Sequence, residues 1–343
     1  MKWEKTLSVN LGANFALFNS KLNGSFNWYY KKTTDVITSA QVPYENGVTT
    51  MYVNDGHMEN RGWDLALSVV PVRTKNFMWS LGTTFSGNDN KVNSNIETTG
   101  DWKEAVSGKY NKKGYPVGSF WAFRFKGLNP ENGGPLFDLS RANTDKAAKD
   151  ATEYMVYAGT SEPTFTMGLN MVFRWKRFSF PLNVYISRGN KTFLASPYDN
   201  GYSMMSEFKN ASSELNKRWR EPGDEKHTDI PSIPVGENCR PLTFEHMEED
   251  PILGKADLYP LDAWAYSDVR VVNAWYIRFN DLKLSYELPE KWIKGFADRV
   301  AVSFTATNPL QIRSKDFKGR DPEVALGNQP RSQNYSLGIN VSF

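Results

Sequence analysis

The last eleven residues, 333–343, read QNYSLGINVSF and decide the fold class. Apolar and small polar side chains alternate along the whole stretch. Successive side chains of a β-strand point to opposite faces, so a period of two predicts a strand with one apolar and one polar face. The apolar set is Tyr335, Leu337, Ile339, Val341 and Phe343.

The same period recurs through the chain. We predict nine strands, at 5–18, 21–32, 60–71, 76–88, 164–175, 178–188, 275–288, 299–307 and 333–343. Within 275–288 the apolar positions change from odd, as at Phe279, to even, as at Leu282. One extra residue would cause that change of phase, which predicts a β-bulge near Asn280 and Asp281.

The polar face indicates what surrounds the strands. It consists mainly of Ser, Asn, Gly and Thr, with few charged side chains. A soluble β-sandwich, which remains the alternative, usually turns Lys, Glu and Arg outward. Small polar residues on one face and Leu, Val and Phe on the other are typical of a barrel with a hydrated lumen and a lipid-facing exterior. We therefore predict an all-β fold, an antiparallel transmembrane β-barrel.

Short and long connections alternate strictly. Short turns are expected at 19–20, 73–76 and 176–177, and a longer one, beginning at Pro289, at 289–298. Long stretches with little periodicity lie at 34–59, 89–163, 189–274 and 308–332. Outer-membrane barrels have short periplasmic turns and long extracellular loops. Single-chain bacterial barrels also have even strand numbers. Nine strands therefore suggest that residues 1–343 are the C-terminal part of a larger barrel, without its plug domain and N-terminal strands.

Composition excludes other classes. The formal net charge of +3 gives no basic surface for nucleic acid. A single cysteine, Cys239, excludes an internal disulfide, and no apolar run approaches the 18 residues of a membrane-spanning helix. The acidic stretch that follows His246 has no metal-ligand spacing, and no nucleotide motif or nucleophilic triad is present. We expect no enzymatic activity, no cofactor and no metal.

A series of short sequence blocks follows one order along the chain. The blocks are 52–65 (YVNDGHMENRGWDL), 114–120 (GYPVGSF), 125–133 (FKGLNPENG), 158–163 (AGTSEP), 219–224 (WREPGD), 267–270 (SDVR), 276–279 (YIRF), 284–289 (LSYELP) and 321–323 (DPE). In order and spacing they resemble blocks of the C-terminal barrel of SusC/RagA-family TonB-dependent outer-membrane transporters of Bacteroidetes. Arg61, Trp63, Asp64 and Pro309 depart from that family's commoner residues.

The resemblance implies about nine strands of a 22-stranded barrel with a plugged lumen. It further implies an energy-coupled importer of oligosaccharides or peptides in the bacterial outer membrane. The implied partners are a SusD-like surface lipoprotein, TonB acting through the absent plug, the remaining barrel and plug portion, the barrel-assembly machinery and the lipid bilayer. A self-contained passive porin or receptor barrel and a secreted sugar-binding β-protein remain the alternatives.

Two sets of residues are candidates for function. The five apolar residues of 333–343, ending in Phe343, resemble the signal that the barrel-assembly machinery reads, because a patterned terminal strand can pair with another sheet edge. Rings in the long loops could instead contact a ligand or partner, since aromatic side chains suit sugar faces and protein interfaces. The role that we favour for each ring is packing of the loops onto each other. These rings are Trp102, Tyr110, Tyr115, Trp121, Tyr198, Tyr202, Trp219, Trp264 and Tyr266.

Overall fold

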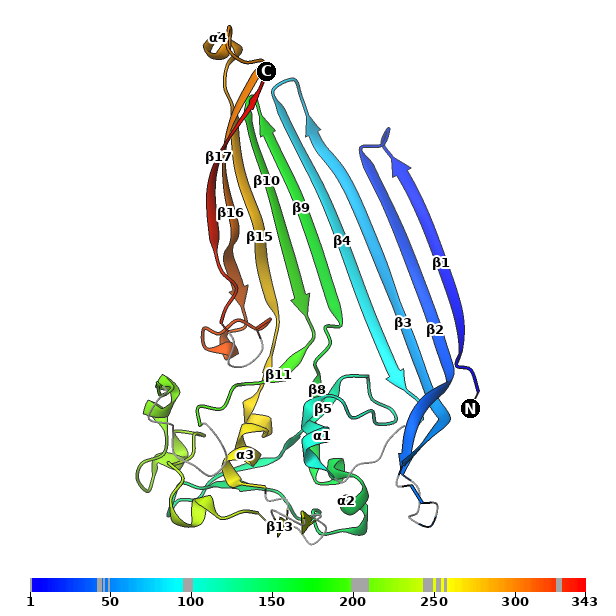
Figure 1. Ribbon diagram of the computed structural model, residues 1–343, viewed down its shortest axis with the longest axis vertical. Helices are drawn as coiled ribbons and strands as arrows, with labels where there is room; N and C mark the ends of the chain where they lie inside the picture. The colour runs from blue at the N-terminus through cyan, green and yellow to red at the C-terminus, as the bar shows by residue number, and fades with distance from the viewer. Residues whose placement is uncertain are drawn as a thin grey trace.

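The computed structural model describes residues 2–41, 45, 47–48, 50–94, 101–198, 210–242, 249–250, 254–255, 258–324 and 329–343. One curved antiparallel sheet of nine strands dominates the molecule (Figure 1). The strands lie in sequence order, and the predicted nine are confirmed. They are β1 (Lys5–Leu17), β2 (Leu22–Gln41), β3 (Thr50–Arg73), β4 (Phe77–Val92), β9 (Phe165–Trp175), β10 (Phe178–Arg188), β15 (Tyr276–Glu287), β16 (Arg299–Arg313) and β17 (Asn334–Ser342).

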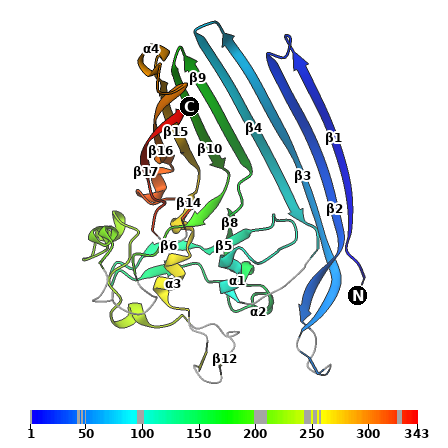
Figure 2. The same cartoon turned by 45° about the horizontal axis from the view of Figure 1, so that its top comes forward.

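The sheet does not close on itself. Strand β1 pairs only with β2 and strand β17 only with β16, so these two strands are its edges (Figure 2). The chain thus forms a section of a barrel wall rather than a closed barrel.

The register separates two faces over all nine strands. One row of paired residues is entirely apolar, and the adjacent row, one residue along each strand, is mostly small and polar. The apolar row is Leu17, Leu22, Val69, Leu81, Met171, Leu182, Leu282, Ala306 and Tyr335. The polar row is Ala16, Asn23, Ser68, Gly82, Asn170, Asn183, Asp281, Thr307 and Asn334. We call these two sides the apolar face and the polar face.

The predicted bulge lies where the change of phase placed it. On β10, Asn183 pairs with Asp281 and the next residue, Val184, pairs with Phe279, so Asn280 is the extra residue of β15. Strand β16 then carries an extra residue against β15, because its pairing passes directly from Thr307 to Leu310. Pro309 lies in this second irregularity, where a missing backbone N–H breaks no ladder bond.

Four strands are longer than the apolar alternation predicts. Strand β2 continues to Gln41, β3 begins at Thr50, β4 continues to Val92 and β16 continues to Arg313. The predicted loop limits 34–59, 89–163 and 308–332 are therefore wrong on their strand sides. Polar segments can extend a sheet because pairing depends on backbone hydrogen bonds, with or without an apolar face.

The long connections fold into small elements at one end of the sheet, the loop end (Figure 1). None of the helices in the described residues has the length and hydropathy needed to cross a membrane. The paired strands are β5 (Ser119–Phe123) with β8 (Met155–Thr160), β6 (Phe125–Leu128) with β7 (Pro135–Phe137), β11 (Lys191–Phe193) with β14 (Val271–Asn273), and β12 (Glu249–Asp250) with β13 (Gly254–Lys255). The α-helices are α1 (Trp102–Ser107), α2 (Asp145–Lys149), α3 (Pro260–Ala265) and, in the turn at the opposite end, α4 (Glu290–Ile293). The 3-10 helices are η2 (Ala151–Glu153), η3 (Ser213–Lys217), η4 (Asp224–Lys226), η5 (Gly236–Cys239), η6 (Asp268–Arg270) and η7 (Lys315–Phe317).

The buried core lies in these loops and not in the sheet. Residues from 102–158 form its largest cluster together with Phe193, Leu258 and Ala263. A second cluster joins Tyr198, Leu215, Ile230, Leu261 and Trp264. The two long connections 89–163 and 189–274 consequently pack as one body.

Candidate functional site

The aromatic residues predicted to face a ligand or partner lie mostly inside the loop core. Their side chains are buried, with Trp264 only 1% exposed. Tyr115 is partly buried, Tyr266 is 36% exposed, and Tyr202 lies outside the described residues. The buried rings are Trp102, Tyr110, Trp121, Tyr198, Trp219 and Trp264.

Contacts among these rings explain their burial. The rings of Tyr110 and Tyr115 meet Trp121 edge-on, at centroid distances of 5.5 and 5.4 Å. Trp264 donates its indole N–H to the Asp229 carbonyl at 2.8 Å, and the Tyr198 hydroxyl donates to the Pro231 carbonyl at 2.6 Å. Burial raises the pKa of the Tyr198 phenol. These six buried rings stabilise the loops in the described structure, and contact of any of them with a ligand or partner stays a prediction. Tyr115 and Tyr266 stay candidates for contact.

A buried ion pair connects the loops. Arg270, at the end of η6, binds the carboxylate of Glu214 in η3, and both side chains are less than a tenth exposed. Lys318 reaches the same carboxylate oxygen of Glu214 at 2.6 Å. The guanidinium of Arg270 also lies over the ring of Trp264, 4.5 Å from its centroid. Burial alone would raise the pKa of Glu214, but the bonds from Lys318 and Arg270 hold it below its ordinary value.

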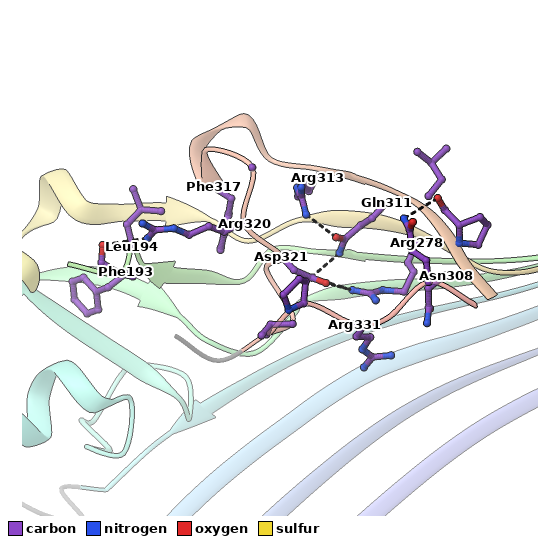
Figure 3. A pocket seen from close by; sticks show the side chains of 17 residues that line it. Phe193, Leu194, Arg278, Asn308, Gln311, Arg313, Phe317, Arg320, Asp321 and Arg331 are labelled. Carbon is purple, nitrogen blue, oxygen red and sulfur yellow. Dashed lines mark hydrogen bonds and ion pairs between the residues drawn. The ribbon is translucent and has the colours of Figure 1, made fainter. Parts of the chain in front are cut away.

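A cavity of about 810 Å³ lies on the polar face where β15 and β16 reach the loop end (Figure 3). Strand β15 contributes Arg278, and β16 contributes Gln311 and Arg313. The segment after β16 contributes Phe317, Arg320 and Asp321, and the chain near β11 contributes Leu194. The cavity therefore depends on three stretches that are far apart in the sequence.

Asp321 organises the cavity wall. Both of its carboxylate oxygens accept from one guanidinium nitrogen of Arg278 at 3.0 Å, and Oδ1 also accepts from the amide of Gln311 at 2.8 Å. Figure 3 shows Arg278 and Gln311 approaching Asp321 from two neighbouring strands. Burial would raise the pKa of Asp321, but hydrogen bonds from Gln311, from the Glu323 backbone and from Arg278 lower it. Glu323 gives Arg278 a second carboxylate partner, at 2.5 Å.

Arginine predominates among the charged groups around the cavity. The lining contains four arginines and one carboxylate, Asp321, while Glu323 stands just behind it. The arginines are Arg278, Arg313, Arg320 and Arg331. With both acids ionised, four positive and two negative charges leave a surplus of +2. This arrangement can hold a negatively charged group and offers no nucleophile or paired acid and base for catalysis.

The alternation singled out no residue of this cavity, although a sequence signal existed. Arg278 and Arg313 occupy polar-face positions, which are otherwise mainly Ser, Asn, Gly and Thr. Asp321 and Glu323 belong to the DPE block that already contributed to the family resemblance.

The terminal strand lies at the sheet edge with its apolar side chains exposed. Leu337 is 81% and Phe343 is 89% exposed. Tyr335, Ile339 and Val341 are also exposed, and each apolar residue from Tyr335 to Val341 pairs with a residue of β16. This geometry leaves one side of β17 open for another strand, and recognition by the assembly machinery stays a prediction.

Within the described part of the chain, no group of three or more His, Cys, Asp or Glu side chains could hold a metal ion. His246 and Glu248 lie outside the described residues.

The open nine-stranded sheet, with an apolar row beside a polar row across every strand, defines a class of protein: a section of an outer-membrane β-barrel wall. Comparison with known proteins is consistent with that class. Residues 1–219 match the family model described as TonB dependent receptor-like, beta-barrel. The chain belongs to this family, which places it in the bacterial outer membrane. Its relatives are receptors and not enzymes.

Three relatives illustrate the similarity. The TonB-dependent receptor SusC of Bacteroides thetaiotaomicron is 26% identical over 368 residues, covering 100% of this chain and 32% of SusC. The TonB-dependent receptor P3 of Formosa agariphila is 23% identical, covering 100% of this chain and 34% of that receptor. The structure of the RagAB peptide transporter superposes with a TM-score of 0.73 at 22% identity, over 100% of this chain and 36% of that one. The chain thus spans about one third of the length of these relatives.

Proposed function

We propose that the chain supplies part of the barrel wall and the loop end of an energy-coupled outer-membrane importer of oligosaccharides or peptides. The observation that carries this proposal is the pair of continuous faces over nine strands, because such a wall suits a barrel that separates lipid from a hydrated lumen. The similarity to SusC, a TonB-dependent receptor, supports energy coupling. The similarity in fold to the RagAB peptide transporter supports peptides as one class of cargo.

The proposed partners follow from the same similarity. A SusD-like surface lipoprotein would cover the loop end, and TonB would act on the portion of the transporter that carries the plug. The long connections would then be extracellular and the turn with α4 periplasmic. The packed loop body supports this arrangement, since connections 89–163 and 189–274 share their buried clusters and form one surface.

Uptake in the native bacterium tests the function. We expect deletion of the complete gene to abolish growth on one class of oligosaccharide or peptide, and depletion of TonB to abolish the same growth. Complementation with the complete gene is the control. Growth that persists without TonB would contradict energy coupling and favour a passive porin. Copurification of a surface lipoprotein with the tagged transporter checks the partner.

A further inference from the structure

The charges around the cavity are only partly neutralised within the chain. Arg278 meets both nearby carboxylates, those of Asp321 and Glu323. In the described residues, Arg313 bonds only a neutral group, the Gln311 side-chain oxygen at 3.1 Å, and Arg320 only the Ala195 backbone carbonyl at 3.3 Å. These two half-buried guanidinium groups therefore line the cavity without an ion-pair partner.

Arg278 adds an independent observation that points to a missing partner. Its side chain is 4% exposed, and its buried Nε–H has no hydrogen-bond acceptor among the described residues. An unpaired buried donor costs free energy, which an acceptor in the adjoining cavity would recover. Planar guanidinium groups also match the two oxygens of a carboxylate, so arginine at this density selects for a planar anion.

The apolar lining residues and the cavity volume indicate what kind of group would fit beside the carboxylate. Leu194, Phe317 and Pro309 give the cavity apolar walls next to the arginines. A volume of about 810 Å³ lies within the range of small-molecule sites, roughly 300–1,000 Å³, and admits more than one sugar or amino-acid unit. The cavity therefore has room for part of an oligomer whose carbon skeleton would lie against these walls.

We propose that this cavity binds a carboxylate group of the transported oligomer, so that the transporter prefers acidic cargo. Arg313 and Arg320 contact the carboxylate, and Arg278 supplies the buried charge behind them. The inference rests on the proposed function and makes it more specific, because it names the chemical class of the cargo. Uronic-acid oligosaccharides and acidic peptides share this carboxylate and are the two sources considered.

Equilibrium binding to the purified full-length transporter tests the proposal without requiring transport. The probes are a galacturonic acid hexamer against a galactose hexamer, and a glutamate hexapeptide against a glutamine hexapeptide. We expect one acidic probe to bind at least tenfold more tightly than its neutral counterpart, and the pair that shows this identifies the source. Acidic probes that bind no better than neutral ones would overturn the proposal.

Matched variants locate the effect in the cavity. Arg313→Gln and Arg320→Gln should each weaken binding of the acidic probe about tenfold, since a hydrogen bond to a charged group is lost. Arg313→Lys, which keeps the charge, should lose less. Arg188→Gln is the control, because Arg188 pairs with Phe165 on the apolar face at the same end of the sheet. An equal loss in Arg188→Gln would assign the preference to general charge and overturn the site.

The binding experiment and the uptake experiment test the two proposals independently. Loss of the acidic preference with TonB-dependent uptake intact rejects only the cavity proposal. Acidic preference without TonB-dependent uptake rejects only the importer proposal. Heat-modifiable migration of each variant on gels checks that its barrel is folded.

Discussion

Gly133 is one of the residues at which the two long connections meet. Its φ is +67°, and a β-carbon there would lie 2.3 Å from Cε3 of Trp219. Trp219 begins the WREPGD block and is buried. This contact explains why a glycine ends the block FKGLNPENG, since a larger residue would displace the indole.

Substituting Gly133 tests that contact. We expect Gly133→Ala to lose about 1–2 kcal/mol from the left-handed backbone and roughly 1–3 kcal/mol more from overpacking against Trp219. Gly236→Ala is the control, because Gly236 has a similar φ of +60° and nothing within 4 Å of a β-carbon. The measurement is hydrogen exchange in the 210–242 segment. Equal effects of the two variants would show that the packing of Trp219 contributes nothing.

Acid should loosen the loop end. The pKa values of Glu214 and Asp321 are lowered in the folded chain, from ordinary values of 4.5 and 3.8. A carboxylate whose pKa is lower in the folded chain than in the unfolded chain stabilises the fold at pH values above its ordinary pKa. This stability is lost as the pH falls through the pKa of the folded chain. We expect proteolysis of 210–242 and 314–324 to accelerate as the pH decreases below about 4. The double variant Glu214→Gln, Asp321→Asn should show a much flatter pH profile. An unchanged profile would contradict the role of these carboxylates.

At the scale of a strand, two consecutive residues face opposite sides of the wall, one toward lipid and the other toward the lumen. Leu169 pairs with Val184 and Thr83, whereas its neighbour Asn170 pairs with Asn183 and Gly82. We expect Leu169→Arg to destabilise the barrel by about 2–4 kcal/mol at mid-bilayer, and Asn170→Arg to be far better tolerated. Unfolding of the complete transporter in lipid vesicles measures both. Equal tolerance would reverse or abolish the assignment of faces.

Strands and bulge were predictable from the sequence because they depend on neighbours along the chain. A period of two identifies the strands, and the phase change at Asn280 identifies the bulge. Strand ends were less predictable, since β2 continues to Gln41 through residues without apolar alternation. The cavity could not be predicted in this way. Arg278 and Asp321, for example, are 43 residues apart and meet only through tertiary packing.

The ring residues show the same limit. For Trp121 and Trp264 the sequence indicated an aromatic residue in a long loop, but it could not decide between packing and ligand contact. Burial depends on which loops fold together, and that is set by contacts such as that of Trp264 with Asp229. Whole connections, not local patterns, therefore determine which rings remain accessible.

At the scale of the whole molecule, we expect the open edge at β17 to act in assembly of the barrel. We expect removal of Phe343 to reduce the amount of folded transporter in the outer membrane several-fold, because the terminal strand offers its edge for pairing during assembly. Phe296→Ala is the control, since Phe296 is an exposed ring at the same end of the sheet, 59% accessible. Heat-modifiable protein in isolated outer membranes gives the readout. Normal levels without Phe343 would contradict the assembly role.

Spatial order equals chain order throughout the nine-stranded sheet, even though the connections from β4 to β9 and from β10 to β15 contain most of the helices and all of the small sheets. Strands that are separated by a long connection still pair directly with each other, as Leu81 of β4 pairs with Met171 of β9. Wall and loops can therefore diverge at different rates. A lineage could exchange either connection while the hydrogen-bonded frame stays in place, and the arginines of β15 and β16 would then remain with the wall.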